Sequence, residues 1–456
     1  MNSNKTLRLS ASASSFAFDP TLIRGYQQTM LLSLFGDTLV RMGDSGAIEP
    51  GIAESWHLTE RAKGYRVTFK LSPQARFHDG RDVRAGDVSW SLSRHFFTDS
   101  TSIVKSYLGV ALASTRLSST GLLDAVEVPD DRTLSIELKG PYPPLLHVLA
   151  SPAFCILPQD FNRDTPIGSG PYAVEAGVGG RAYDDGKTHL VASPHFSGEG
   201  QKFERVTVSI LKFKEEILNA FGKGEVDFSL GIPFSEIGPG DMPTDGELVS
   251  GTELAITNAF VNMGCPAFSS RDFRRDLAAL IELVKSTPEL MTRFDRMHSC
   301  FLPAGIMRES YYERPALRII PGEFKEKWAA HSPPKLDIVI AIGFCTFAFK
   351  AAFRRIFETA GLEFEFRELK GDPLGQVIVR GEYDLILLPY AGLIADPDGF
   401  LDLLDPQGLM KAGQIFEEEY YVIPIAGQRI PALYRKGLKV GAVGAARYLD
   451  LRGVGW

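Results

Sequence analysis

The chain has 456 residues, of which 44% are hydrophobic and 23% are charged, and its formal net charge is −7. Because a single hydrophobic core seldom extends over so long a chain, we expect about two or three domains. This balance argues against a nucleic-acid-binding protein, which would need Lys and Arg gathered on one face. The short basic run Arg271, Arg274 and Arg275 is expected on the solvent-exposed side of a helix. No run of about 18 apolar residues predicts a membrane-spanning helix.

The N-terminal segment, up to Leu34, predicts a strand (KTLRLSAS), a turn at Asp19-Pro20 and a helix of about 15 residues. It lacks the apolar stretch of a signal peptide. This leaves two locations open: the cytoplasm, or the periplasm with an export signal outside this chain.

The following elements are predicted from alternation and from helix-start signals. Residues 65–77 alternate between apolar and polar and predict two strands around a Ser-Pro turn. Residues 82–96 predict a helix, for which Asp82 or a neighbour would provide the N-cap. Residues 132–140 predict another strand, and 141–151 begin with prolines and become helical.

Strand–helix–strand units occur three times in the rest of the chain. The first covers 204–230 (ERVTVSILK, KEEILNAFGKG, VDFSLG), and the second covers 335–369. The third consists of the helix GDPLGQVIVRG and the strand YDLILLPY. Strands that alternate with helices predict an α/β protein whose sheets are covered by helices.

Two short fragments resemble each other: GEVDFSLG at 224–231 and GEYDLILL at 381–388. Each places Gly-Glu-x-Asp between a helix and an apolar strand. The fragments are too short to establish a repeat, but they suggest two α/β lobes. Ligands of α/β sheets bind beyond the carboxyl ends of the strands. The segments after these strands, Ile232-Pro233 and Pro389-Tyr390, are therefore candidate cleft walls.

The sequence contains no complete motif for catalysis, metal binding or nucleotide binding. The eight histidines do not occur in pairs with metal-ligand spacing, and phosphate-loop, dinucleotide and nucleophile-elbow patterns are incomplete. We therefore expect no metal, no cofactor and no catalytic residues, so the protein is not expected to be an enzyme. The four cysteines are far apart, and buried free thiols are favoured over the three disulfide pairings that remain open. They are Cys155, Cys265, Cys300 and Cys345.

Five ordered motifs follow a Leu-Phe and Leu-Val opening between residues 34 and 96. They are Glu49-Pro50, Ala53-Glu54-Ser55-Trp56, Thr68-Phe69-Lys70-Leu71, Phe77-His78-Asp79-Gly80 and Ala85-x-Asp87-Val88. This region resembles the signature of the extracellular solute-binding protein family 5, which holds the oligopeptide-, dipeptide- and nickel-binding proteins of ABC transporters. We expect most of these residues, His78 and Trp56 included, to have structural roles in turns and packing.

The resemblance continues downstream and covers nearly the whole chain. The segment 166–172 (PIGSGPY) is similar to the family's Gly-Thr-Gly-Pro-Tyr segment. Phe260-Val261-Asn262 and the helix RRDLAALIELV are similar to its strand and helix in the second lobe. The segment 396–400 (DPDGF) resembles its Asp-Pro-Asp-Asn-Phe motif, although the part after it is shorter than usual.

The resemblance implies a two-lobed periplasmic-binding-protein-like α/β fold of type II, with a hinge and an interlobe cleft. Lobe one is expected at 1–251 together with 426–456, and lobe two at 252–425. Such proteins close around a ligand by rotation about the hinge.

The function implied is that of a periplasmic, monomeric solute-binding protein of an ABC importer. It would bind an oligopeptide-like or other small polar solute and present it to the transporter permease, with no nucleic-acid partner. The alternative is a cytoplasmic ligand-sensing protein that uses the same fold. A signal peptide in the uncut gene would favour transport.

One position departs from the peptide-binding members of the family. Where they place an acidic residue that holds the peptide's terminal ammonium, three positions before Asp396, this chain has Leu393. An aliphatic side chain does not offset the cost of burying a charged amine, so peptides with a free N-terminus are not expected as ligands. The residues predicted to line the ligand site are Phe35, Gly36, Tyr172, Tyr390, Gly392 and Leu393.

Overall fold

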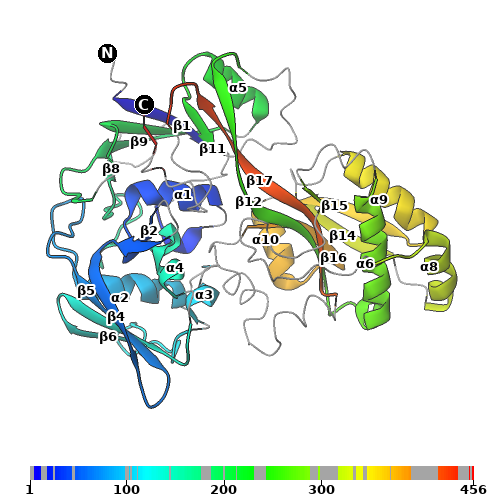
Figure 1. Ribbon diagram of the computed structural model, residues 1–456, viewed down its shortest axis with the longest axis horizontal. Coiled ribbons are helices and arrows are strands. Elements are labelled where there is room, and N and C mark those ends of the chain that lie inside the picture. The colour runs from blue at the N-terminus through cyan, green and yellow to red at the C-terminus, as the bar shows by residue number, and fades with distance from the viewer. Residues whose placement is uncertain are drawn as a thin grey trace.

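The structure, a computed structural model, has two lobes joined by two long strands, β12 (Gly246–Val261) and β17 (Val422–Arg435) (Figure 1). The two-lobed α/β fold predicted from the sequence is thereby confirmed. The residues that it describes are 5–11, 18–23, 26–43, 47–97, 102, 105–109, 111–142, 145–175, 186–198, 201–211, 213–230, 243–287, 296–297, 317–331, 335–341, 347–369, 371–391, 420–439, 451 and 454–455.

Lobe one comprises the elements before β12 and contains the larger hydrophobic core. Its elements are β1 (Thr6–Ala11), η1 (Pro20–Leu22), α1 (Tyr26–Phe35), β2 (Val40–Met42), β3 (Ile48–Pro50), β4 (Ala53–Glu60), β5 (Tyr65–Leu71), α2 (Ala85–Ser93), η2 (Arg94–Phe96), α3 (Lys105–Gly109), β6 (Val126–Asp130), β7 (Thr133–Leu138), α4 (Leu145–Ala150), η3 (Pro152–Phe154), β8 (Tyr172–Val174), β9 (Lys187–Ala192), β10 (Arg205–Ile210), α5 (Lys214–Gly222) and β11 (Phe228–Leu230).

Lobe two comprises the elements between β12 and β17 and has a separate core, rich in phenylalanine from α9. Its elements are η5 (Pro266–Phe268), α6 (Arg271–Lys285), β13 (Arg296–Met297), α8 (Pro321–Trp328), η6 (Ala329–His331), β14 (Leu336–Ala341), α9 (Phe347–Thr359), β15 (Phe364–Leu369), α10 (Gly371–Arg380) and β16 (Leu385–Ala391). The predicted lobe boundaries, 251/252 and 425/426, fall inside β12 and β17 and stay predictions.

One sheet passes through both lobes. Among the described strands its order is β15-β14-β16-β12-β17-β11-β1-β10-β9-β8, with β13 added beside β17. In lobe one, β10, β1 and β11 are parallel, and in lobe two β15, β14 and β16 are parallel. The hinge strands β12 and β17 are antiparallel to each other and to the parallel strands beside them.

The two Gly-Glu-x-Asp fragments occupy equivalent places in the two lobes. In lobe one, the Asp227 amide donates to the Arg8 carbonyl (2.8 Å), and its carboxylate accepts from the Arg8 amide (3.1 Å). In lobe two, Asp384 makes the same pair of contacts with Asp337, at 2.9 Å and 2.8 Å. The aspartate therefore joins the strand that it precedes to the central parallel strand in each lobe, as the suggestion of two α/β lobes requires.

A separate sheet in lobe one, in the order β4-β5-β7-β6, corrects one prediction. Within residues 65–77 there is one strand and not two: β5 ends at Leu71, because the chain turns at Ser72. Beyond the turn only an isolated bridge forms, between Arg76 and Asp82. Asp82 is also not the cap of the next helix, since its carboxylate binds Arg132 (2.9 Å).

The helix after this turn is nevertheless present, as α2 followed by η2. Arg84 is its N-cap residue, and its amide donates to the Asp87 carboxylate (2.9 Å). The first predicted helix is shorter than expected: α1 has 10 residues, preceded by η1, whose N-cap is Asp19.

The prediction for the basic run on α6 was wrong at Arg274. This side chain is 2% exposed, and it donates to the carbonyl of Phe268 (2.7 Å) and lies over the ring of Tyr421 (4.7 Å). A guanidinium with a backbone acceptor and an aromatic face is stable in a buried place, which a charge pattern alone does not reveal.

Two of the cysteines, Cys155 and Cys265, are free and buried, as predicted. Burial raises the pKa of the Cys155 thiol to about 12, so this thiol is unreactive at neutral pH. Cys300 and Cys345 lie outside the described residues.

Candidate functional site

The carboxyl ends of the parallel strands in both lobes point toward the middle of the molecule. β11 runs antiparallel to β17, and its last residue, Leu230, lies opposite Ala432. β16 runs antiparallel to β12, and its last residue, Ala391, lies opposite Ala255. Since the other parallel strands follow β11 and β16, six carboxyl ends are directed at the region between the lobes. This is the place where α/β sheets bind ligands.

Tyr390 lies at this edge of lobe two. It is the penultimate residue of β16, and its backbone is paired with Ile256 of β12. The next positions along the chain, Gly392 and Leu393, lie outside the described residues, as do Ile232 and Pro233 in lobe one. The strand-end position predicted for Tyr390 is thus observed, whereas its contact with a ligand stays a prediction.

The predicted lobe-one residues belong to one junction between the end of α1 and the segment 166–172. The Gly170 amide donates to the Phe35 carbonyl (2.9 Å), and the Asp37 amide donates to the Ser169 hydroxyl oxygen (3.0 Å). The Ser169 hydroxyl in turn donates to the Ile156 carbonyl (2.7 Å). Motifs that are far apart in the sequence therefore meet in a single polar network.

His78 also belongs to this junction, because its side chain binds the backbone of the segment 166–172. Its Nδ1 accepts the Gly168 amide hydrogen (3.1 Å), and its Nε2 donates to the Gly170 carbonyl (3.1 Å). These two contacts fix the neutral tautomer with its proton on Nε2. Burial lowers the pKa of His78 to about 4. The structural role expected for His78 is confirmed.

The rings of Phe35 and Tyr172 are both in the core of lobe one. Phe35 has an exposed fraction of 0% and packs against Phe18 and His78, with ring centroids 4.5 Å and 5.3 Å away. Tyr172 is 1% exposed, and its hydroxyl oxygen accepts the Phe203 amide hydrogen (3.2 Å). Burial raises the pKa of Tyr172. Both side chains support the junction from within, and their contact with a ligand stays a prediction.

Substitution of Gly170 tests how tightly this junction is packed. A Cβ atom at Gly170 would lie 2.6 Å from the carbonyl carbon of Phe35 and 2.7 Å from the amide nitrogen of Gly36. Since backbone atoms must move to relieve such contacts, Gly170→Ala is expected to lower the free energy of unfolding by about 2–3 kcal/mol. Urea denaturation of the variant measures this loss.

The matched control for this experiment is Gly140→Ala. A Cβ atom at Gly140 has no neighbour within 4 Å, and this substitution is expected to change stability little. Equal unfolding midpoints for the two variants would contradict the tight packing of the junction.

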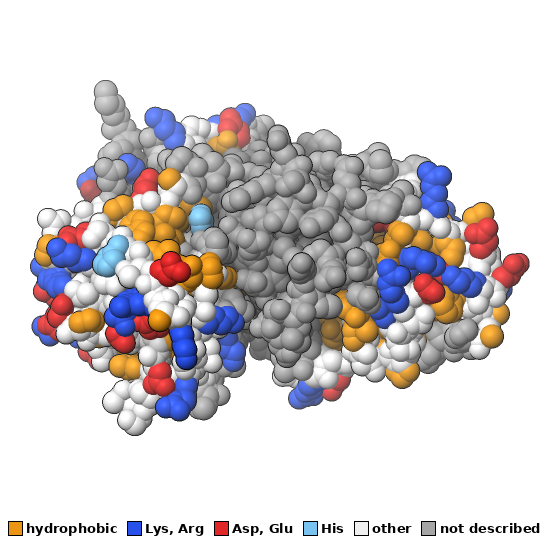
Figure 2. All heavy atoms as spheres, turned by 60° about the horizontal axis from the view of Figure 1, so that its bottom comes forward, with side chains coloured by type: hydrophobic (Ala, Val, Ile, Leu, Met, Phe, Trp, Pro, Cys, Tyr) orange, Lys and Arg blue, Asp and Glu red, His pale blue; other side chains and the backbone are white. Residues whose placement is uncertain are grey.

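The described residues contain no group of three or more His, Cys, Asp or Glu side chains arranged to hold a metal ion. In the same part of the chain, the helices are too short or too polar to cross a membrane. Acidic and basic side chains are interspersed over the described surface in Figure 2.

Comparison with known proteins agrees with this architecture. Residues 47–283 match the model of the bacterial extracellular solute-binding proteins, family 5 Middle. The probable D,D-dipeptide-binding periplasmic protein DdpA of Escherichia coli (strain K12) is 24% identical over 250 residues, which cover 52% of this chain and 44% of DdpA. The HTH-type transcriptional regulator SgrR of Pectobacterium atrosepticum is 30% identical over 151 residues, covering 31% of this chain and 23% of SgrR. The matches thus span less than half the length of these curated relatives.

A solved structure shows the same fold over almost its full length. The ABC transporter-associated periplasmic binding protein DppA from Helicobacter pylori, in complex with the peptide STSA, superposes with a TM-score of 0.82 at 17% identity. The superposition covers 98% of this chain and 97% of DppA. The family model covers a little over half of the 456 residues. The chain therefore belongs to the bacterial extracellular solute-binding proteins, family 5.

Proposed function

We propose that this protein is the periplasmic solute-binding component of an ABC importer and holds an oligopeptide-like or other small polar solute between its lobes. The observation that carries this proposal is the direction of the strands: six carboxyl ends, three from each lobe, point at the interlobe region. A solute bound there touches both lobes and favours the closed arrangement, which a transporter permease then distinguishes from the open one.

Transport is preferred to sensing because of the extent of the matches. The similarity to DdpA covers 52% of this chain, whereas the similarity to the regulator SgrR covers 31%.

The residue at position 393 narrows the class of solute. Leu393 follows the carboxyl end of β16 by two residues in the sequence. A leucine there offers no charge to a ligand ammonium, and an uncompensated buried charge is costly. We therefore propose ligands without a free terminal ammonium at this position, such as N-blocked peptides, sugars or conjugates.

A thermal-shift screen of the purified protein tests the proposal. The panel holds free and N-blocked di- to pentapeptides, oligosaccharides, opine-like conjugates and nickel. A ligand at 100 times its dissociation constant adds about 2.7 kcal/mol of stability, which raises the melting temperature by a few degrees. Stabilisation by blocked peptides, sugars or conjugates alone is expected. Stabilisation by free peptides would contradict the role proposed for Leu393, and no stabilisation by any compound would argue for sensing.

Tyr390→Ala is expected to weaken binding of the compound found in this screen by about two- to tenfold, because an aromatic face in contact with a solute contributes about 0.5–1.5 kcal/mol. Titration calorimetry measures the dissociation constant. Tyr390→Phe keeps the ring and is expected to bind as the parent does. Tyr65→Ala, in the four-stranded sheet of lobe one, is the control for loss of a tyrosine elsewhere. Unchanged affinity in Tyr390→Ala would remove this residue from the site.

A further inference from the structure

The two hinge strands β12 and β17 are paired along most of their length, but not evenly. From Gly246 to Ser250 the register with β17 is regular. It then shifts between Ser250 and Glu253 and between Glu253 and Ala255, and a third shift follows between Thr257 and Asn258, where β12 is also paired with β16 of lobe two. Each shift interrupts the ladder of hydrogen bonds and increases the local bend and twist of the strands.

The first two shifts coincide with a stretch in which neither lobe adds a further strand to β12 and β17. Pairing of lobe one with β17 ends at Ala432, and pairing of lobe two with β12 begins at Ala255. In the described part of the chain, residues 251–254 of β12 and 428–431 of β17 take part in pairing between these two strands alone: Glu253 pairs with Arg429, and the flanking pairs are Ser250 with Pro431 and Ala255 with Gln428. Among the described residues, these two short segments are therefore the part of the connection between the lobes with the fewest neighbouring strands.

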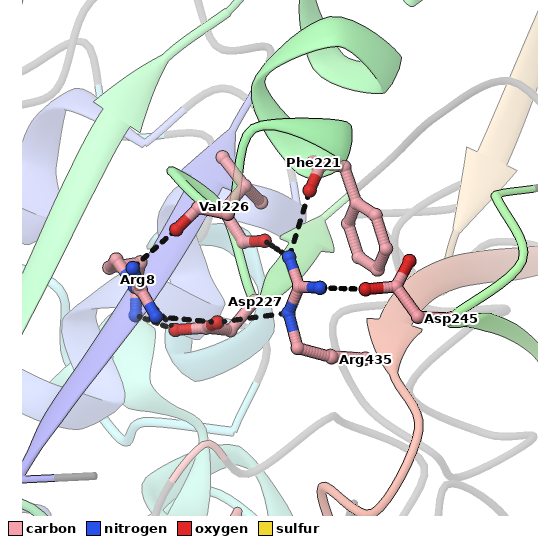
Figure 3. A network of polar contacts seen from close by, with 7 residues as sticks. Arg8, Phe221, Val226, Asp227, Asp245 and Arg435 are labelled. Atoms are coloured by element: carbon pink, nitrogen blue, oxygen red, sulfur yellow. Dashed lines mark hydrogen bonds and ion pairs between the residues drawn. The ribbon is translucent and has the colours of Figure 1, made fainter.

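On the lobe-one side of this gap, β17 ends in a network around the buried carboxylate of Asp227 (Figure 3). The guanidinium of Arg8, from β1, donates to Asp227 from Nε (2.9 Å) and from a terminal nitrogen (3.1 Å). The guanidinium of Arg435, the last residue of β17, donates from Nε to Oδ1 of Asp227 (3.3 Å), an oxygen that also accepts from Arg8. One carboxylate thus joins the first strand of the lobe to the last residue of the returning hinge strand.

Arg435 also binds three further pieces of lobe one. A terminal nitrogen donates to the carbonyls of Phe221 (2.8 Å) and Val226 (3.1 Å), and the guanidinium lies 4.6 Å from the centroid of the Phe221 ring. Phe221 is in the last turn of α5, where a cation also interacts favourably with the helix dipole. The other terminal nitrogen pairs with Asp245, directly before β12 begins. Both hinge strands are therefore tied to lobe one at Arg435.

Lobe two holds β17 differently. Lys285 of α6 donates to the Pro424 carbonyl (3.2 Å), which ties the beginning of β17 to that lobe. The lobe-two counterpart of Asp227 is Asp384, and the nearby Arg367 binds Asp337 (2.8 Å). Among the described residues, the hydrogen bonds of Arg367 go to Asp337 and to the Glu382 carbonyl, both in lobe two. β17 is thus anchored near both of its ends, with residues 428–431 between the anchors.

We propose that Arg435 is a positioning residue for lobe closure: it fixes the lobe-one ends of both hinge strands and confines rotation to residues 251–254 and 428–431. The use of this rotation for ligand capture rests on the proposed function, but the confinement itself is a property of the ligand-free protein. The guanidinium binds the segment before β11, the end of α5 and the segment before β12 at once, so these three segments are prevented from moving separately. Without it, β12 and β17 could also rotate on the lobe-one side of residues 251–254 and 428–431.

The test measures interlobe distances in the protein without ligand. Fluorophores are attached through unnatural amino acids at the exposed positions Thr59 in β4 and Glu326 in α8, which leaves the cysteines untouched. Single-molecule energy transfer then gives the distribution of distances between the lobes. Arg435→Gln is expected to broaden this distribution about twofold, because more relative orientations of the lobes become populated. Arg367→Gln, which removes an arginine–aspartate pair inside lobe two, is expected to leave the width unchanged.

The proposal is overturned if Arg435→Gln lowers the melting temperature but keeps the parent distribution, since the network would then stabilise lobe one without restricting the hinge. Equal broadening in Arg435→Gln and Arg367→Gln would overturn it as well. If Arg435→Gln does not fold, Asp245→Asn removes only the half-exposed partner, and a smaller broadening is expected. The absence of a solute in this experiment separates its outcome from that of the thermal-shift screen.

Discussion

Replacement of Asp227 by alanine is expected to lower the free energy of unfolding by about 3–5 kcal/mol. The Asp227 side chain is completely buried and is shared by the guanidinium groups of Arg8 and Arg435. Without the carboxylate, two positive charges remain close together with fewer acceptors, and the strand-joining contact to the Arg8 amide is lost. Denaturation in guanidinium chloride, followed by circular dichroism, measures the loss.

The control for this prediction is Asp124→Ala, which removes an aspartate that pairs with the exposed Arg116. An exposed ion pair contributes about 0–1 kcal/mol, so this variant is expected to resemble the parent. A loss of less than about 1 kcal/mol in Asp227→Ala would show that the buried network contributes no more than a surface pair.

Acidification is expected to destabilise the protein well before most carboxylates are protonated, because two buried histidines are neutral in the folded state. Burial lowers the pKa of His78 to about 4, and burial together with the charge of Arg94 lowers the pKa of His95 to about 3. His95 is 1% exposed, and its Nδ1 is 2.7 Å from the Ser102 hydroxyl oxygen. The charges of Asp79 near His78 and of Asp19 near His95 favour the imidazolium, but burial outweighs them at both sites.

The sign of the effect follows from the pKa of histidine in the unfolded chain, which is about 6.5. Below that pH the histidines are protonated in the unfolded chain but stay neutral in the folded protein. Their contribution to the free energy of unfolding is therefore fully present above pH 6.5 and is lost as the pH falls toward 4 and 3. From pH 7.5 to pH 5, each of the two histidines is expected to remove about 2 kcal/mol from the free energy of unfolding. Urea denaturation across this range measures the slope.

Two variants show which histidines cause the dependence of the free energy of unfolding on pH. His78→Asn is expected to be less stable at pH 7.5, since its contacts with Gly168 and Gly170 are changed, but to lose about half as much stability on acidification. His57→Gln, at an exposed position of β4, is expected to keep the parent slope. A parent protein that is equally stable at pH 7.5 and pH 5 would show that neither buried histidine stays neutral.

Much of the secondary structure was predictable because it depends on near neighbours. The alternation in 204–230 and 335–369 predicted units that the structure contains as β10-α5-β11 and β14-α9-β15. The Gly-Glu-x-Asp fragments predicted similar lobes, since each fragment ends a helix and begins an apolar strand. Tyr390 was placed at a strand end by the same local reasoning, and it lies there.

The candidate site was less predictable, because its parts come together only in the folded chain. His78 binds Gly168 and Gly170 across about 90 positions of sequence, a pairing that no local pattern contains. Phe35 and Tyr172 were placed in the cleft wall by their motifs, whereas the structure shows their rings in the core. The burial of a side chain depends on which distant segments cover it. The positions of two motifs along the sequence do not show how the motifs are arranged in space.

The sequence by itself determined the α/β class, the order of most elements and the family, because hydrophobic periodicity and short motifs are properties of neighbouring residues. Only the tertiary structure decided which charges are buried and which segments of β12 and β17 are proposed to allow rotation of the lobes. Asp227 and Arg8 are 219 positions apart, and Arg274 appeared solvent-exposed by its charge pattern although the fold buries it. A buried charge is stable only when the fold places partners beside it. The position of the hinge depends on where β12 and β17 have no further strand paired beside them.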